Sequence, residues 1–471
     1  MQTRYTSADQ WADAKDGVIP APYALEEGEQ IIDQYLEPVI FHNVNGPDIG
    51  VTTCGVIVKD GLYFKDLDNS GELAPYKDWR LSPEQRAEDM VKHLRLDQQA
   101  GLVLNTLFNS PVVPTRAEAT NAEGKLELGK IYKHHNPGEK PMPGPLPGMT
   151  VSIDDSHVLE KHIAAGVYRG DMRCEAGMVA LYHNAGTQML EYEACKGGVA
   201  IPYSLHTNPI NIGYPDSLGI GAAVIGDGNT DMVYEMAQTD RKMMKAEGLN
   251  IMYGPQVDVT SDPRWPRTSG TYGERPDVTS DIAEALVKGY QDGDNGLNEG
   301  SVVLTIKHFP GDAPSENGFE PHVPIGQWRI YRTPGSMEKY HLPPFQRAFD
   351  HKVSSIMPDY SRIATDGRAV PQTYRGEITS TEEVPSAYSK ELITDLARNK
   401  MGFDGYVNSD SGITTVQIYG VENLTEPERY AKAISAGTDV IGGNTDPENI
   451  VKAVEDGLLP KADLDRASYN R

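Results

Sequence analysis

The stretch that decides the fold is Val302–Asp312, which reads VVLTIKHFPGD: a run of apolar residues followed at once by polar and turn-forming ones. Two other segments repeat this order. DVTSDPRWPRTSGTYGE (258–274) follows the apolar run Ile251–Tyr253, and NSDS (408–411) follows Gly405–Val407. Polar and ionisable groups at the ends of successive buried strands are how an α/β barrel builds an active site. The recurrence therefore predicts a barrel with a site at one end.

Short apolar runs alternate with amphipathic helical patterns from about residue 100 onward. Strands are expected at Gly101–Leu104, Gly166–Tyr168, Ala200–Leu205, Ile251–Tyr253, Val302–Ile306, Val353–Met357, Gly405–Val407 and Asp439–Ile441. Helices are expected at Glu175–Cys195, Thr230–Glu247, Asp281–Asp292, Met337–Asp350, Ser389–Lys400 and Glu426–Ser435. Crossovers long enough for a helix favour parallel pairing, so the pattern predicts an α/β fold, a closed (β/α)8 TIM-type barrel. A doubly wound open sheet is the alternative.

The chain of 471 residues has room for one elaborated barrel. We expect residues 1–80 to form an irregular N-terminal extension packed on the barrel, and residues 81–471 to form the barrel itself. Within the extension, Asp66–Glu72 has the oxygen-ligand spacing and central glycine of a calcium loop. Position twelve of that loop is Lys77, where a bidentate glutamate would close the shell. An Asp/Asn/Gly-rich turn is therefore the favoured interpretation.

Composition narrows the range of partners. The chain has 68 acidic and 43 basic residues and a formal charge of −25, which disfavours nucleic acid and anionic membranes as partners. The sequence contains no run of about 18 apolar residues, so we expect no membrane span. Three scattered cysteines predict neither a disulfide framework nor a cysteine-rich zinc site. The first residues, MQTRY, lack the pattern of a secretory signal, which indicates the cytoplasm, or the periplasm or exterior if a leader was removed.

Three groups of residues have the chemistry of a sugar site. Lys307 and His308 stand where a strand gives way to a Pro-Gly turn, and both offer hydrogen bonds to hydroxyl groups. Asp410 ends another strand; its carboxylate suits a nucleophile, a base or a metal ligand, and a helix N-cap is the structural alternative. Arg264 and Arg267 follow a third strand, and each is either a ligand clamp or the partner of Glu274 in an ion pair.

KHFPGD (307–312), DPRWPRTSGTYGERP (262–276), VSSIMPDYS (353–361) and GFDGYVNSDSGI (402–413) together resemble the signatures of glycoside hydrolase family 3, in the same order and spacing. The resemblance runs from about residue 66 to the end of the chain. It implies a (β/α)8-type barrel as the first domain of the family. It also implies the activity of many members, which are retaining exo-β-glucosidases or related exo-β-glycosidases.

The resemblance assigns roles residue by residue. NSDS aligns with the family segment that holds the nucleophile, which would be Asp410. Lys307, His308 and Arg267, with Arg264 as a weaker match, correspond to residues that bind the terminal sugar. Met357 and Tyr360 fall where the family lines that subsite and steadies the nucleophile. Asn208 stands where the family has an aspartate that grips a hydroxyl, and Ser411 stands where it has a tryptophan, so the sugar and aglycone preferences are open.

The proton donor is the residue that the resemblance does not supply directly. In two-domain members it comes from a second α/β-sandwich domain, which is absent from this chain. Single-domain hexosaminidases of the family instead use a histidine paired with an acidic residue, and Glu320-Pro321-His322 resembles that motif on the loop after the Lys-His pair. An imidazole at this place can donate a proton near neutral pH.

The sequence thus predicts a retaining exo-β-glycosidase, β-glucosidase-like, that acts on a small glycoside or oligosaccharide through a covalent intermediate on Asp410. It needs no metal or organic cofactor. The alternatives are a β-N-acetylhexosaminidase or a glycoside phosphorylase that uses His322. A sugar-binding barrel that is inactive without a second domain or subunit is a further alternative.

Overall fold

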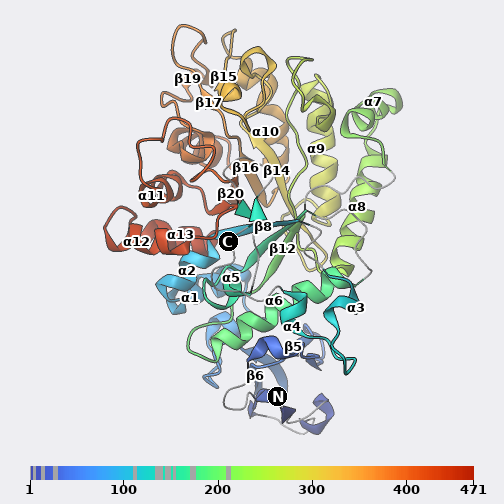
Figure 1. Cartoon of the computed structure of the whole chain (residues 1–471). Helices are drawn as coiled ribbons and strands as arrows, with labels where there is room; N and C mark the ends of the chain where they lie inside the picture. Colours follow the sequence, from blue (N-terminus) through green and yellow to red (C-terminus); the bar gives the residue numbers. More distant parts are fainter. Residues whose placement is uncertain are drawn as a thin grey trace.

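The computed structural model describes residues 2–3, 7–11, 16–24, 30–109, 114–132, 142–143, 150–151, 155–169, 177–207 and 214–471. Its centre is a closed barrel in which every neighbouring pair of strands is parallel (Figure 1). The strands are β8 (Leu104–Asn109), β11 (Ala165–Arg169), β12 (Ser204–Thr207), β13 (Ile251–Met252), β14 (Val303–Phe309), β16 (Ser355–Pro358), β20 (Tyr406–Ser411) and β21 (Val440–Gly442). The predicted (β/α)8-type barrel is confirmed.

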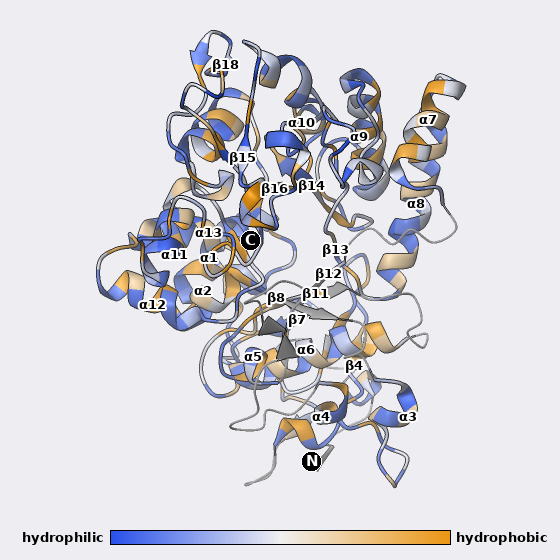
Figure 2. Ribbon diagram, turned by 45° about the horizontal axis from the view of Figure 1, so that its top comes forward, coloured by the Kyte–Doolittle hydropathy of each residue, from blue (hydrophilic) through white to orange (hydrophobic). Residues whose placement is uncertain are grey.

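Helices that precede, connect and follow the strands cover the outside of the barrel. They are α1 (Pro83–His93), α2 (Leu96–Leu102), α6 (Met178–Ala194), α7 (Ser217–Asp227), α8 (Asp231–Ala246), α9 (Pro276–Tyr290), η8 (Met337–His341), α10 (Pro343–Asp350), η10 (Glu391–Lys400), α11 (Glu426–Ala436), α12 (Pro447–Glu455) and α13 (Lys461–Asn470). Hydrophobic and hydrophilic bands alternate along α9 and α10 (Figure 2), and their apolar faces pack on strand residues such as Leu304, Ile306 and Ile356. None of the helices in the described ranges is long and apolar enough to cross a membrane.

Short elements complete the chain. The helices α3 (Arg116–Ala119), α4 (Leu128–Ile131) and α5 (Ser156–Leu159) lie between β8 and β11. The two-stranded pairs outside the extension are β9 (Met142–Pro143) with β10 (Thr150–Val151), β15 (Trp328–Arg329) with β17 (Arg362–Ile363), and β18 (Thr373–Tyr374) with β19 (Glu377–Ile378).

Two predicted elements differ from the structure in an instructive way. The strand expected at Gly101–Leu104 begins only at Leu104, because Gly101 belongs to the last turn of α2. A Cβ at Gly101 would lie 2.3 Å from the carbonyl oxygen of Lys161, so the apolar run reflects close packing of a helix end. The single helix expected at Met337–Asp350 is divided at Leu342, because Pro343 begins a new helix, as proline favours the first helical position.

The N-terminal extension contains small antiparallel sheets: β2 (Gly17–Ile19), β6 (Gly55–Lys59) and β7 (Leu62–Asp66); β4 (Val39–Phe41) and β5 (Ile49–Val51); and β1 (Gln2–Thr3) and β3 (Tyr23–Ala24). It is joined to the barrel through Glu191 of α6. The buried Glu191 carboxylate accepts hydrogen bonds from the backbone N–H and the hydroxyl of Thr52, at 3.0 and 2.7 Å, and pairs with Lys65. These contacts fix the extension against one covering helix.

Candidate active site

The carboxyl ends of β14, β16 and β20 bring together most of the residues that the sequence singled out. Lys307 and His308 lie on β14, Met357 lies on β16, and Asp410 lies on β20. Nε2 of His308 is 3.7 Å from Oδ2 of Asp410. The carboxylate and the imidazole therefore face each other across the end of β16, which lies between β14 and β20 in the barrel. Active sites of barrels of this type lie at these strand ends.

Asp410 is a buried carboxylate in a cationic environment. It is 7% exposed, and its Oδ1 accepts the backbone N–H of Ser411 at 2.7 Å. Burial by itself raises the pKa of the Asp410 carboxyl. The charges that His308, His322, Lys307 and Arg267 carry at acidic pH more than offset that effect and hold the pKa below its usual value. Asp410 is consequently an anion at neutral pH, as a nucleophilic carboxylate must be.

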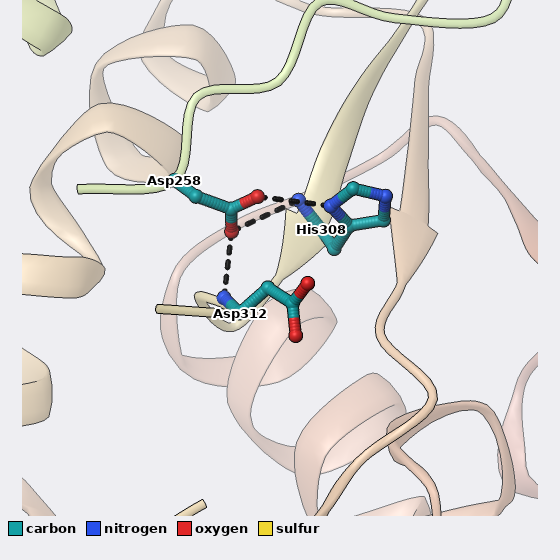
Figure 3. Close-up of side chains that lie close together, drawn as sticks. All are labelled: Asp258, His308 and Asp312. Carbon is teal, nitrogen blue, oxygen red and sulfur yellow. Dashed lines mark hydrogen bonds and ion pairs between the residues drawn. The ribbon is translucent and has the colours of Figure 1, made fainter. Parts of the chain in front are cut away.

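His308 is held by Asp258, which lies on the loop that follows β13 (Figure 3). Oδ2 of Asp258 is 2.9 Å from Nδ1 of His308, while Oδ1 accepts the backbone N–H of His308 at 3.3 Å and that of Asp312 at 2.6 Å. Burial, reinforced by Arg267, lowers the pKa of His308 to about 4, although Asp258 acts in the opposite direction. The ring is therefore neutral at pH 7 and fixed in orientation.

Arg267 joins the cluster from the same loop as Asp258. Its Nη2 is 3.1 Å from Nε2 of His308, and its Nη1 is 3.2 Å from Oδ2 of Asp312. Arg264 does not join it: the Arg264 side chain is 69% exposed and pairs with Asp262 at 2.6 Å. The partner of Arg264 is thus Asp262, two residues away on the same turn, and not Glu274, and the partner of Arg267 is Asp312.

Lys307 lies beside a small cavity. Its Nζ donates to the carbonyl oxygen of Tyr253 at 2.7 Å and is 5.8 Å from the centre of the Tyr253 ring. A cavity of about 280 Å³ is lined by Lys307 and Arg267 together with residues such as Gln256 and Tyr272. Much of the remaining lining comes from the covering helices α7, α8 and α9, and neither Asp410 nor His308 is among the lining residues. The cavity therefore meets the cluster only at Lys307 and Arg267.

Tyr360 links the nucleophile strand to the loop that bears His322. The Tyr360 hydroxyl donates to the carbonyl oxygen of Ser411 at 2.7 Å. The rings of Tyr360 and His322 are edge to face with centres 5.1 Å apart. Met357 is also buried, packed with Tyr253, which directly follows β13. Both residues that the resemblance placed in the subsite thus lie at the strand ends.

Glu320 and His322 form a pair at the rim of the site. Nδ1 of His322 contacts Oε2 of Glu320, and both side chains are half-buried. Burial raises the pKa of Glu320, but His322 and Arg267 lower it by more, so the pKa of the Glu320 carboxyl lies below its usual value. The hydroxyl of Tyr419 fixes the loop by donating to the carbonyl oxygen of Pro321 at 3.0 Å. Asn208, the remaining predicted ligand, lies outside the described residues.

A buried ion network next to the cluster includes charged residues that sequence reasoning missed. Arg329, on β15, pairs with Asp312 and lies 3.3 Å from Asp359 through Nε, and all three side chains are 1% exposed. Asp312 therefore connects Arg267 in the site to Arg329 below it. The sequence around Arg329 gave no local signal, because its partners Asp312 and Asp359 come from the loops after β14 and β16.

Asp258, His308 and Asp312 place ligand-type atoms within 4.8 Å of one another, as in a metal site. Their atoms are already bonded. The oxygens of Asp258 accept from His308 and the backbone of Asp312, and the carboxylate of Asp312 pairs with two arginines. Cationic partners this close repel a metal ion, so the group fits a role in positioning His308 better than one in metal binding.

The model of the glycosyl hydrolase family 3 N-terminal domain matches residues 195–470, more than half of the chain. The chain belongs to glycosyl hydrolase family 3. The family predicted from the four motifs is thereby confirmed.

Relatives of known name are similar over much of the chain. A periplasmic β-glucosidase/β-xylosidase of Dickeya chrysanthemi is 30% identical over 88% of this chain and 62% of the relative. β-Glucosidase C of Emericella nidulans is 33% identical over 59% of this chain and 46% of the relative. The solved structure of a β-glucosidase from Erythrobacter marinus shares the fold, with a TM-score of 0.62 and 22% identity over 84% of this chain and 45% of that one. The chain spans about half to three fifths of the length of these relatives.

Proposed function

We propose that this family 3 barrel is the catalytic part of a retaining exo-β-glycosidase of the β-glucosidase type, with Asp410 as the nucleophile. The observation that supports this proposal most is the setting of Asp410. It is a buried carboxylate at a strand end whose pKa is held below the usual value by cationic neighbours, and its Oδ2 lies 3.7 Å from Nε2 of His308. An ionised carboxylate beside hydroxyl-binding groups suits attack on an anomeric carbon.

In the proposed reaction, the terminal sugar binds with its hydroxyl groups on Lys307, His308 and Arg267, against the wall formed by Met357 and Tyr360. Asp410 attacks C1 and the leaving oxygen takes up a proton, which yields a covalent glycosyl-enzyme. Water then attacks C1 from the side that the leaving group occupied, so the configuration at C1 is retained. The substrate is a small glycoside or oligosaccharide, and this chemistry requires no metal or organic cofactor.

The proton donor has two candidate sources. One is a second domain or subunit, which is consistent with relatives that are longer than this chain. The other is His322 with Glu320 as its partner. The second source is supported by the position of His322 near Tyr360, and by the effect of its charge on the pKa of Asp410. A histidine donor is the feature expected of a β-N-acetylhexosaminidase or a glycoside phosphorylase, which is our second candidate function.

Replacement of the nucleophile tests the proposal. Asp410→Asn keeps the shape of the side chain and its bond to Ser411, and should lower the hydrolysis of aryl β-glucosides at least about 10³-fold. Azide should restore product release from Asp410→Ala, because a small anion can occupy the space left by the carboxylate. An Asp410→Asn protein with wild-type turnover would eliminate the proposed nucleophile.

Substrate comparison separates the candidate functions. Preference for aryl β-glucosides over aryl N-acetyl-β-glucosaminides favours the first, the opposite preference favours the hexosaminidase, and rates that depend on phosphate favour the phosphorylase. Binding of glucose by calorimetry without turnover of any substrate would identify a sugar-binding barrel that needs a partner domain or subunit.

A further inference from the structure

Lys77 lies in the interior of the N-terminal extension with its ammonium group surrounded by oxygen atoms. Nζ donates to Oδ1 of Asp66 at 2.6 Å, to Oγ of Ser70 at 2.8 Å and to the carbonyl oxygen of Glu72 at 2.9 Å, and it also contacts Oδ1 of Asp68. The Lys77 side chain is 0% exposed. A lysine is rarely buried unless its charge is paired, so this loop is built around a cation.

The surrounding atoms match the ligand positions of a twelve-residue calcium loop. Counting from Asp66, such a loop supplies side chains at positions 1, 3 and 5, a backbone carbonyl at position 7 and a bidentate glutamate at position 12, with glycine at position 6. The glycine is Gly71, whose φ of +76° favours that residue and whose N–H donates to Oδ2 of Asp66 at 2.8 Å. Position 12 is Lys77, which reaches back to where the ion would lie.

The substitution at position 12 preserves the charge of the loop. A loop with carboxylates at positions 1, 3 and 12 and a Ca²⁺ ion has one net negative charge. Asp66, Asp68 and the Lys77 ammonium also sum to one negative charge. One lysine therefore removes the third carboxylate and supplies the cation at the same time.

The loop also holds the extension against the barrel. The carbonyl oxygen of Leu67 accepts the backbone N–H of Ala200 at 2.7 Å, in the segment that leads into β12. Oδ1 of Asn69 accepts the N–H of Gly55 at 2.8 Å, and its Nδ2 lies 3.2 Å from Sγ of Cys195. A cation at the centre of the loop therefore stabilises the backbone that makes these contacts.

We propose that the Asp66–Lys77 loop is a calcium-type loop in which the Lys77 ammonium occupies the ion position, so that the loop is closed without a divalent metal. Its remaining ligands are arranged to accept Ca²⁺ once a carboxylate returns to position 12. Lys77→Glu should therefore convert the loop into a Ca²⁺ site.

The experiment compares the thermal unfolding of the full chain with EDTA and with millimolar Ca²⁺. The wild-type midpoint should be the same in both. Lys77→Glu should unfold about 3–5 °C lower in EDTA, because three carboxylates then share the loop without a cation, and Ca²⁺ should restore the midpoint. The unfolding midpoint of Lys77→Met should be lowered both in EDTA and in Ca²⁺, since this variant has neither the cation nor the glutamate ligand. Lys59→Glu, at an exposed position, has the same charge change and should not respond to Ca²⁺.

A spectroscopic measurement localises the metal. The Tyr76 ring centre is 5.6 Å from Nζ of Lys77, so a Tb³⁺ ion at the Nζ position should show tyrosine-sensitised emission in Lys77→Glu and not in the wild-type protein. If Lys77→Glu folds only when Ca²⁺ is supplied, the proposal is supported; if it fails in both conditions, or folds without responding to Ca²⁺, the proposal is wrong. Ca²⁺ stabilisation of the wild-type protein that is lost in Asp66→Asn would also overturn it.

Discussion

Nη2 of Arg267 lies 3.1 Å from Nε2 of His308, on the side of the ring opposite to Asp258. A guanidinium group can only donate hydrogen bonds, so Nε2 of His308 is the acceptor and the ring proton is on Nδ1. The Nδ1–H group therefore donates a hydrogen bond to the Asp258 carboxylate. This arrangement agrees with a His308 pKa of about 4. The imidazole is thus a neutral, oriented group, and the lasting positive charges beside Asp410 at neutral pH are Lys307 and Arg267.

Arg267 and Arg264, three residues apart, form a matched pair for mutagenesis. Arg267→Lys should lower kcat/KM for aryl β-glycosides about 10–100-fold, because one ammonium cannot reproduce the fork that joins His308 to Asp312. Arg264→Lys should leave kcat/KM nearly unchanged, since Arg264 is exposed and pairs only with its own turn. Equal losses in the two variants would contradict the placement of Arg267 in the site.

Asp258 should act as a positioning residue for His308. Asp258→Asn keeps an oxygen for the backbone N–H groups but presents an amide to Nδ1, which forces the other tautomer and sets Nε2–H against Arg267. We expect kcat/KM to fall about 10–100-fold, with a tautomer change in the ¹⁵N NMR spectrum of His308. Asp262→Asn, four residues later, is the control and should change neither. An Asp258→Asn protein with an unaltered His308 spectrum would disprove this role.

The proton donor can be assigned through leaving groups. If His322 is the donor, His322→Gln should slow glycosides of poor leaving groups about 10²–10⁴-fold and those of dinitrophenol far less, because a good leaving group departs without protonation. Glu320→Gln should show the same dependence more weakly. If His322→Gln lowers the rate equally for all leaving groups, His322 binds substrate. If the rate does not fall, the proton donor comes from a second domain or subunit.

The pH dependence of stability should depend on His341. This ring is buried next to Gly311, and burial together with Arg329 lowers its pKa to about 4, against the effect of Asp258. An unfolded histidine has a pKa of about 6.5, so between pH 6.5 and 4 only the unfolded chain takes up this proton, and stability falls as the pH falls. His341 should contribute about 3 kcal/mol to that loss.

Comparison of variants isolates this contribution from those of other titrating groups. His341→Gln should make the decline in unfolding midpoint between pH 6.5 and 4 shallower than in the wild-type protein. His42→Gln, at an exposed histidine, should leave the slope unchanged. A slope that is steeper in His341→Gln would show that the buried ring is protonated in the folded state.

The parts of this fold that could be predicted from sequence are those with a local pattern. The run Val302–Ile306 predicted β14, and the polar residues after it predicted the end of the barrel that bears the site. Gly101 shows the limit, since its neighbours look like a strand until the packing of Lys161 is known. Tertiary contact decided that element, and no local pattern records it.

The site divides in the same way. Asp410 and the Lys-His pair could be identified from motif and strand position, and the structure brings them together. The bond between Asp258 and His308 joins residues 50 positions apart, and Arg329 finds its partners on two other loops. Such pairings follow from barrel closure, which sets the neighbours of each strand end, so sequence spacing could not predict them.

The anchoring of the extension on Glu191 has a practical consequence for anyone who produces this protein. A recombinant chain that starts at residue 81 would lack Thr52 and Lys65 and leave the Glu191 carboxylate without these partners in an apolar setting. It would also uncover core residues of the barrel that pack against Ile31 and Leu36. Such a shortened product should aggregate in the expression host, so trimming for crystallisation should stay upstream of Ile31.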